Sequence, residues 1–100
     1  MVVVDGELDV DTAPGLSAQL MPLATAGRHL ILDLAGLQFC DCAGLSLFLR
    51  LQRYAIAAGG SLHLASLTAQ LRRLITIARL TDVLPIADSP ADVMARPGAS

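Results

Sequence analysis

The sequence predicts an α/β protein with a small, mostly parallel sheet and alternating helices. Residues 2–4 are a β-branched run and residues 29–34 a nearly continuous apolar one, as in buried strands, and residues 61–65, Ser-Leu-His-Leu-Ala, are expected to form a further strand. The segments between them are long enough for helices and repeat apolar residues at intervals of three and four. Strands and helices that alternate in this way are typical of parallel sheets joined by right-handed crossovers.

The first strand is expected over residues 2–8, where a valine run leads into alternating polar and apolar residues. A helix should follow, with Thr12 or Asp11 capping its free amides. Pro14 fits the first turn of that helix, because an N–H there has no partner within the helix.

This first helix contains Pro22, which should kink it or end it near Met21, since a proline in a helix interior costs about 3 kcal/mol. Gly27 should close the element. Residues 29–34 are then expected to form the central strand, and residues 35–41 a loop.

A second helix is predicted over residues 43–58, stopping at Gly59 and Gly60. Its polar stripe is narrow, so its apolar residues exceed what one sheet face needs, and the surplus should meet a flanking helix or an external partner. The stripe consists of Ser46, Arg50, Arg53 and Ala57; the apolar remainder includes Leu45, Leu47, Phe48, Leu49, Leu51, Tyr54 and Ile56.

The last third should contain a strand at residues 61–65 and a third helix capped by Thr68. The apolar face of this helix would carry Leu71, Leu74, Ile75 and Ala78. Residues 83–87 form a short strand candidate, which Pro85 confines to a sheet edge or a strand start. A short helix is expected over 89–95 and a frayed tail after it. The chain is therefore expected to be a single domain, 1–100, with its core in about 2–87.

Charge and composition exclude several classes of function. Seven basic residues, all arginine, and nine acidic ones give a net charge of −2, whereas a nucleic-acid partner needs a concentrated basic surface. No apolar run approaches the roughly 20 residues of a membrane span, and no signal peptide is recognisable. Cys40 and Cys42 are too close in sequence to staple distant elements, which favours reduced thiols and a cytoplasmic location.

No pattern points to catalysis, to a cofactor or to a metal site. The cysteine spacing is one residue shorter than Cys-x-x-Cys, and His29 and His63 fall on predicted strands. Neither a Gly-x-Ser-x-Gly elbow nor a glycine-rich phosphate loop occurs, so an enzyme is not expected. Cys42 lies at a predicted helix start, where amide dipoles stabilise a thiolate, so a thiol-based redox sensor remains an alternative.

Several motifs in combination resemble the STAS domain of bacterial anti-sigma-factor antagonists. The likeness spans about residues 2–87 and is carried by Gly6-Glu7-Leu8-Asp9, Thr12-Ala13-Pro14, Leu30-Ile31-Leu32-Asp33-Leu34, Phe39-Cys40-Asp41-Cys42-Ala43-Gly44-Leu45 and Ala58-Gly59-Gly60. The resemblance implies a non-catalytic module for transcription regulation. Such a module docks on an anti-sigma factor that is also a serine kinase and thereby releases the sigma factor.

The resemblance also implies a docking surface around the Asp-x-x-Gly motif. Asp41 and Gly44 match the motif, and Asp9 matches the acidic residue beside the surface. The full set of expected partner-binding residues is Asp9, Thr12, Asp41, Cys42, Ala43, Gly44, Leu45, Leu47 and Phe48.

Two features depart from the family pattern. Cys42 and Ala43 occupy the positions where the phosphate-accepting hydroxyl is found, and neither has one; Ser46 is the nearest hydroxyl. The first strand of the family is also expected to be missing, because only residues 1–5 precede Gly6. A STAS-like accessory subunit of a transporter or stress complex therefore stands as the alternative function, and a homodimer is left open.

Overall fold

Parallel strand pairs form the β-structure of the computed structural model, which describes residues 1–89 and 91. Four strands pair in the order β1-β3-β5-β6, and two more pair as β2-β4, all of them parallel. Their bounds are β1 Val2–Val3, β2 Gly6–Leu8, β3 His29–Asp33, β4 Leu37–Cys40, β5 Ser61–Ala65 and β6 Ile86–Ala87. The predicted central strand, with the segments 2–8 and 61–65 on either side, is confirmed.

The segment predicted as one strand over residues 2–8 is in fact two. Gly6 has a φ of +83°, which turns the chain between them, and the register shifts between Gly6 and Glu7. The backbone N–H of Val4 donates to Asp33 O at 3.0 Å and that of Gly6 to Gly36 O at 3.0 Å. The strand pair β1–β3 therefore continues into β2–β4 across the bend.

The prediction of a loop over residues 35–41 was wrong, because β4 lies within it. Both ends of β4, Leu37 and Cys40, are buried, whereas Gln38 and Phe39 between them are exposed. This pattern is not a strict alternation, so sequence periodicity does not reveal the strand. The segment becomes a strand because it pairs with β2, which is distant in sequence.

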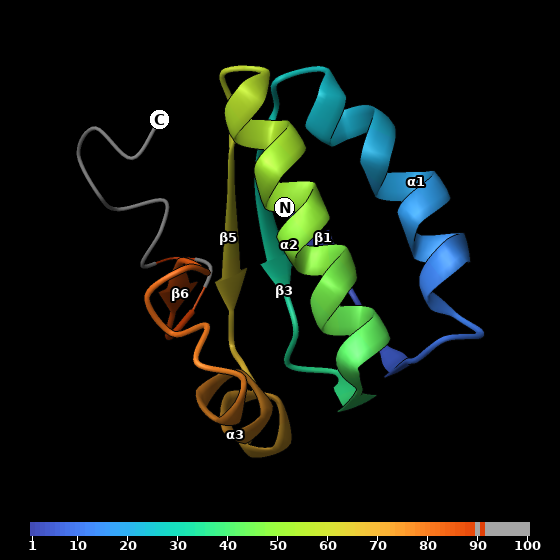
Figure 1. Ribbon diagram of the computed structural model, residues 1–100, viewed down its shortest axis with the longest axis vertical. Coiled ribbons are helices and arrows are strands. Elements are labelled where there is room, and N and C mark those ends of the chain that lie inside the picture. The colour runs from blue at the N-terminus through green and yellow to red at the C-terminus, as the bar shows by residue number, and fades with distance from the viewer. Residues whose placement is uncertain (90, 92–100) are drawn as a thin grey trace.

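Helices α1 (Ala13–Thr25) and α2 (Cys42–Ala57) lie side by side against the sheet, and α3 (Ala69–Ile77) lies near the end of β5 (Figure 1). Both α1 and α2 begin at the end of the molecule where β3 and β5 finish (Figure 1). The apolar core between helices and sheet contains no buried polar side chain among the described residues.

Helix α1 departs from prediction at both ends. Pro14 lies in its first turn as expected, but the Thr12 side chain makes no capping bond to it. Pro22 does not end the helix, which continues to Thr25. Leu20 and Ala24 are buried on either side of the proline, so packing holds both halves in helical conformation.

Helix α2 matches its prediction within one residue at each end, and Gly59, with a φ of +87°, follows its C-cap. Most of its apolar surplus is absorbed by the molecule itself. The side chains of Leu45, Leu47 and Phe48 are buried, whereas Tyr54 and Ile56 are exposed towards the far end of the helix.

The C-terminal elements follow the predictions with two exceptions, of which the first is that the strand expected over residues 83–87 is shorter, β6 covering Ile86–Ala87 alone. Thr68 caps α3 by accepting from the Leu71 N–H at 3.3 Å. Ala78 was expected on the buried face but is exposed at the C-cap. Pro85 directly precedes the edge strand β6, as predicted. The helix expected over 89–95 and the frayed tail lie, apart from Ser89 and Ala91, outside the described residues.

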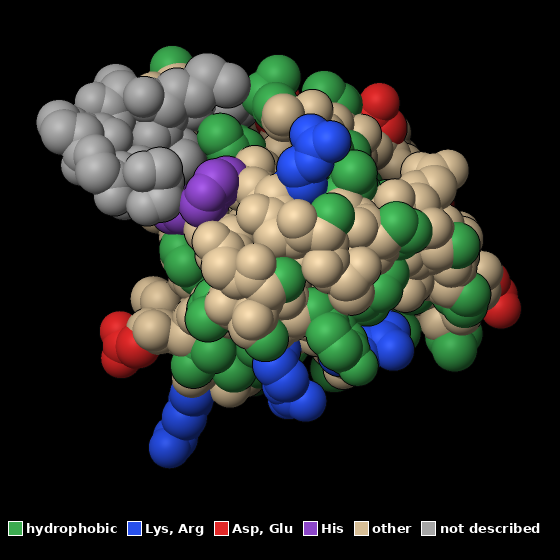
Figure 2. Space-filling model, turned by 90° about the horizontal axis from the view of Figure 1, so that it is seen from above, with side chains coloured by type: hydrophobic (Ala, Val, Ile, Leu, Met, Phe, Trp, Pro, Cys, Tyr) green, Lys and Arg blue, Asp and Glu red, His purple; other side chains and the backbone are tan. Residues whose placement is uncertain are grey.

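No helix in the described part of the chain is both long enough and apolar enough to span a membrane. At the end of the molecule seen in Figure 2, hydrophobic side chains lie scattered among polar and backbone atoms, and charged side chains project at its rim.

The fold predicts opposite effects for two glycine substitutions. A Cβ on Gly44 would come within 2.6 Å of Cys40 Sγ and 2.8 Å of Leu8 Cγ, whereas one on Gly15 would meet nothing within 4 Å. Gly44→Ala should therefore lower the free energy of unfolding by about 1–3 kcal/mol through overpacking. Gly15→Ala, within α1, should raise it by about 0.5–1 kcal/mol. Urea unfolding measures both, and a stabilising Gly44→Ala would contradict the close packing.

Candidate docking site

Two strand ends and two helix starts meet at one end of the molecule. The turn of residues 9–12 connects β2 to α1, and Asp41 connects β4 to α2. The Asp41 N–H donates to the Leu8 carbonyl at 3.1 Å, which joins the two connections. In open α/β sheets, ligands bind outside this carboxyl end of the strands.

Asp9 organises the first connection. Its Oδ1 accepts hydrogen bonds from the backbone N–H of Asp11 at 2.9 Å and of Thr12 at 3.0 Å. The bonds from Thr12 and then Asp11 lower the pKa of the Asp9 carboxyl, since they favour its charged form. The carboxylate is therefore a fixed negative charge beside the start of α1.

Thr12 is the N-cap residue of α1, but its side chain bonds to the preceding turn and not to the helix amides. Its Oγ1 accepts from the Asp9 N–H at 2.9 Å and donates to the Glu7 carbonyl at 2.9 Å. The expectation that Thr12 or Asp11 caps the helix through its side chain is therefore wrong. The Thr12 hydroxyl is hydrogen-bonded within the turn that Asp9 closes, and the Asp11 side chain is exposed.

Asp41 is the N-cap of α2. Its Oδ1 accepts from the Ala43 N–H at 2.9 Å and from the Gly44 N–H at 3.4 Å. These bonds satisfy two amides that have no partner within the helix and set a negative charge at the positive end of its dipole. The aspartate of the Asp-x-x-Gly motif thus has a structural role, as the cap of α2.

A glutamine that the sequence did not single out holds the end of β4, next to Asp41, through two hydrogen bonds. Gln70, on α3, accepts from the Cys40 N–H through Oε1 at 3.1 Å and donates to the Cys40 carbonyl through Nε2 at 2.9 Å. The amide bonds to β4 as a neighbouring strand would. A lone glutamine on a helix face gives no sequence signal for this contact.

The two cysteines differ in environment. Cys40 is buried, and burial, followed by the charges of Asp41 and Cys42, raises the pKa of its thiol to about 12. Cys42 is exposed at the first position of α2. Within residues 1–89 and 91, no three His, Cys, Asp or Glu side chains gather as a metal site would require.

The expected partner-binding residues divide into exposed and buried sets. Thr12 and Cys42 are exposed, and Asp9, Asp41 and Ala43 are partly so. The others, Gly44, Leu45, Leu47 and Phe48, are buried in the monomer and cannot touch a partner without rearrangement. The helix periodicity explains the difference, because α2 turns these residues towards the sheet.

Two exposed apolar side chains at this end were not among the expected residues. Val10, in the turn before α1, is 71 % exposed, and Phe39, on β4, is 42 % exposed. An exposed valine directly after an Asp and an outward-facing aromatic beside the motif are the signals that could have identified them. Apolar side chains exposed beside fixed charges are typical of protein interfaces.

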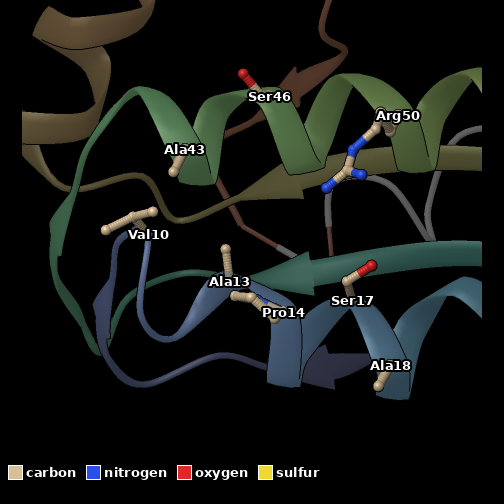
Figure 3. Close-up of a pocket in the computed structure, with 8 residues that line it drawn as sticks. All are labelled: Val10, Ala13, Pro14, Ser17, Ala18, Ala43, Ser46 and Arg50. Carbon is tan, nitrogen blue, oxygen red and sulfur yellow. The ribbon is translucent and has the colours of Figure 1, made fainter.

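A groove of about 570 Å³ runs from this end between α1 and α2 (Figure 3). Small or apolar side chains line most of it, with two hydroxyls and one guanidinium. The lining residues are Val10, Ala13, Pro14, Ser17, Ala18, Ala43, Ser46 and Arg50.

Comparison with known proteins identifies related chains. A family model described as "Mlab, STAS domain" matches residues 1–85. The anti-sigma-B factor antagonist of Bacillus subtilis is 37 % identical over 86 residues, covering 86 % of this chain and 79 % of the relative. The anti-sigma F factor antagonist of Paenibacillus polymyxa is 26 % identical over 96 residues, covering 94 % and 82 %.

Solved structures share the fold. A crystal structure of a Thermotoga maritima protein assigned as an anti-sigma factor antagonist superposes with a TM-score of 0.83 at 18 % identity, covering 92 % of this chain and 82 % of the other. The unphosphorylated anti-sigma factor antagonist SpoIIAA gives a TM-score of 0.69 at 21 % identity, covering 90 % and 79 %.

The thiol environments lead to a pH prediction. The Cys40 thiol ionises near its ordinary value of 9.0 in the unfolded chain but only near 12 in the fold. Its contribution to stability is therefore complete below about pH 9 and is lost as the pH rises towards 12, by at most about 1.4 kcal/mol per pH unit. Urea unfolding between pH 8 and 10.5 should show this slope in the wild type and in Cys42→Ala, and a weaker slope in Cys40→Ala. Equal slopes in all three would contradict the assignment.

Proposed function

Because this chain belongs to the STAS domain family, we propose that it is a non-catalytic interaction module that antagonises an anti-sigma factor of the serine-kinase type. The observation that carries the proposal is the end of the molecule where two capped helix starts surround exposed apolar side chains. The names of the Bacillus and Paenibacillus relatives support the same role. Such a role places the protein in the cytoplasm, where sigma factors act.

The proposed docking surface comprises Asp9, Val10, Thr12, Phe39, Asp41, Cys42 and Ala43. Two fixed carboxylates, Asp9 and Asp41, would set its charge, and Val10 and Phe39 would supply apolar contact area. Leu45, Leu47 and Phe48 would act beneath it, by holding α2 against the sheet. Gly44 would act by letting the helix start approach β2 and β4 closely.

The proposed antagonist has no phosphorylation switch at the motif. A serine kinase transfers phosphate to a hydroxyl oxygen, and Cys42 and Ala43 offer a thiol and a methyl group instead. A phosphate there would bring about −1.5 to −2 charge close to the carboxylates of Asp41 and Asp9. We therefore propose that binding persists until abundance or a competing partner ends it.

Two alternatives predict different partners or different control. An accessory subunit of a transporter or stress complex would use the same surface on another protein. A redox sensor would respond through Cys42, whose exposure meets the first requirement for oxidation. Self-association into a homodimer is compatible with either role and is measured by light scattering.

The docking surface predicts a selective loss of binding. Val10→Asp adds a charge to an exposed apolar position beside Asp9 and should weaken binding of the purified anti-sigma factor at least about tenfold. Ile56→Asp, at an exposed apolar position near the far end of α2 from the docking surface, should change the affinity less than about twofold. Calorimetric titration measures both. If the wild-type chain binds no anti-sigma factor encoded in its own genome, the proposed antagonist function is rejected. If the two variants weaken binding equally, the proposed docking surface is rejected.

The missing hydroxyls predict a gain of function. After incubation with the cognate anti-sigma kinase and ATP, the intact mass of the wild type should stay unchanged, whereas Cys42→Ser or Ala43→Ser should gain one phosphate and lose binding. Ser46→Ala is the control, because Ser46 is the nearest native hydroxyl. Phosphate on the wild type that disappears in Ser46→Ala, together with loss of binding, would show that a switch exists one turn further along α2.

A further inference from the structure

The groove between α1 and α2 has one charged side chain in its lining, Arg50, which has no partner in the part of the chain that the structure describes. Within residues 1–89 and 91, Arg50 forms neither an ion pair nor a side-chain hydrogen bond. Neither α1 nor α2 contains an Asp or Glu, so no carboxylate on these helices can neutralise it. In Figure 3 the guanidinium extends from α2 into the space between the two helices.

The acidic side chains lie at the other end of the groove. Asp9 and Asp41 are bonded to the amides at the two helix starts, and Asp11 lies in the same turn. Val10 and Ala43 line the groove between this acidic mouth and its interior. A carboxylate on a partner would be repelled at the mouth and attracted at Arg50, two turns further along α2.

On these grounds we propose that the groove binds a segment of the anti-sigma factor that places an apolar side chain near Val10 and Ala43 and an Asp or Glu side chain at Arg50. The proposal rests on the proposed function and specifies the chemistry that the partner must present. The groove continues the proposed docking surface, with which it shares Val10 and Ala43.

The spacing of the two contacts follows from helix geometry. Ala43 and Arg50 are seven residues apart on one face of α2, which is about 10 Å along the axis. An extended chain covers that distance in about three residues. The acidic residue should therefore lie about three positions from the apolar one if the segment is extended. The hydroxyl of Ser17, on the α1 side, is placed to hydrogen-bond such a segment.

The charge of Arg50 and the space beside it can be tested separately. Arg50→Glu should weaken binding of the purified anti-sigma factor by at least about tenfold, whereas Arg53→Glu, on the same exposed stripe but outside the groove lining, should change it by less than about twofold. Ala18→Phe should fill the groove and weaken binding similarly, whereas Gln19→Phe, exposed on the neighbouring face of α1, should not. The difference between the wild type and Arg50→Ala should shrink as salt is raised.

The outcomes separate the groove from the function as a whole. Wild-type binding that survives both Arg50→Glu and Ala18→Phe would overturn the groove proposal and leave the antagonist function standing. Equal weakening by Arg50→Glu and Arg53→Glu would also overturn it, since only overall charge would then matter. A wild-type dimer that Arg50→Glu dissociates would assign the groove to a second copy of this chain. Wild-type chain that does not bind the anti-sigma factor would reject both proposals.

Discussion

The close approach of the start of α2 to strands β2 and β4 is the constraint on which the proposed docking end of this protein depends. Gly44 leaves no room for a Cβ between α2 and the side chains of Cys40 and Leu8. The contact brings the Asp41 cap beside the Leu8 carbonyl, so the ends of β2 and β4 are joined at one point. A larger residue at position 44 would lift the helix start and displace the exposed residues next to it.

Hydrogen bonds to the two connections convert this packing into a rigid surface. Asp9 closes the turn before α1. The Gln70 side chain holds β4 by bonding to both the backbone N–H and the backbone carbonyl of Cys40. Because these groups are already bonded within the molecule, little ordering is needed when a partner binds. The same bonds hold the carboxylates at the helix starts, where the dipoles stabilise their charge.

The distribution of charge along α1 and α2 gives the surface a direction. Negative groups gather at the helix starts, and Arg50 lies two turns away in a groove without acidic neighbours on either helix. In the proposed binding mode a partner must match both signs at a fixed spacing, which is a stronger requirement than a match to one sign. The two thiols near the start of α2 differ in exposure, since Cys40 is buried and Cys42, two residues further on, faces solvent.

By itself the sequence determined the features that depend on near neighbours along the chain. The apolar run of β3, the extent of α2 and the Thr68 cap follow from periodicity and capping chemistry within a few residues. The tertiary structure decided whatever depends on a distant partner. Strand β4 exists through its pairing with β2, and α1 continues past Pro22 because Leu20 and Ala24 pack in the core. The burial of Leu47 and Phe48 and the groove beside Arg50 likewise require the relative placement of α1, α2 and the sheet, which no local pattern encodes.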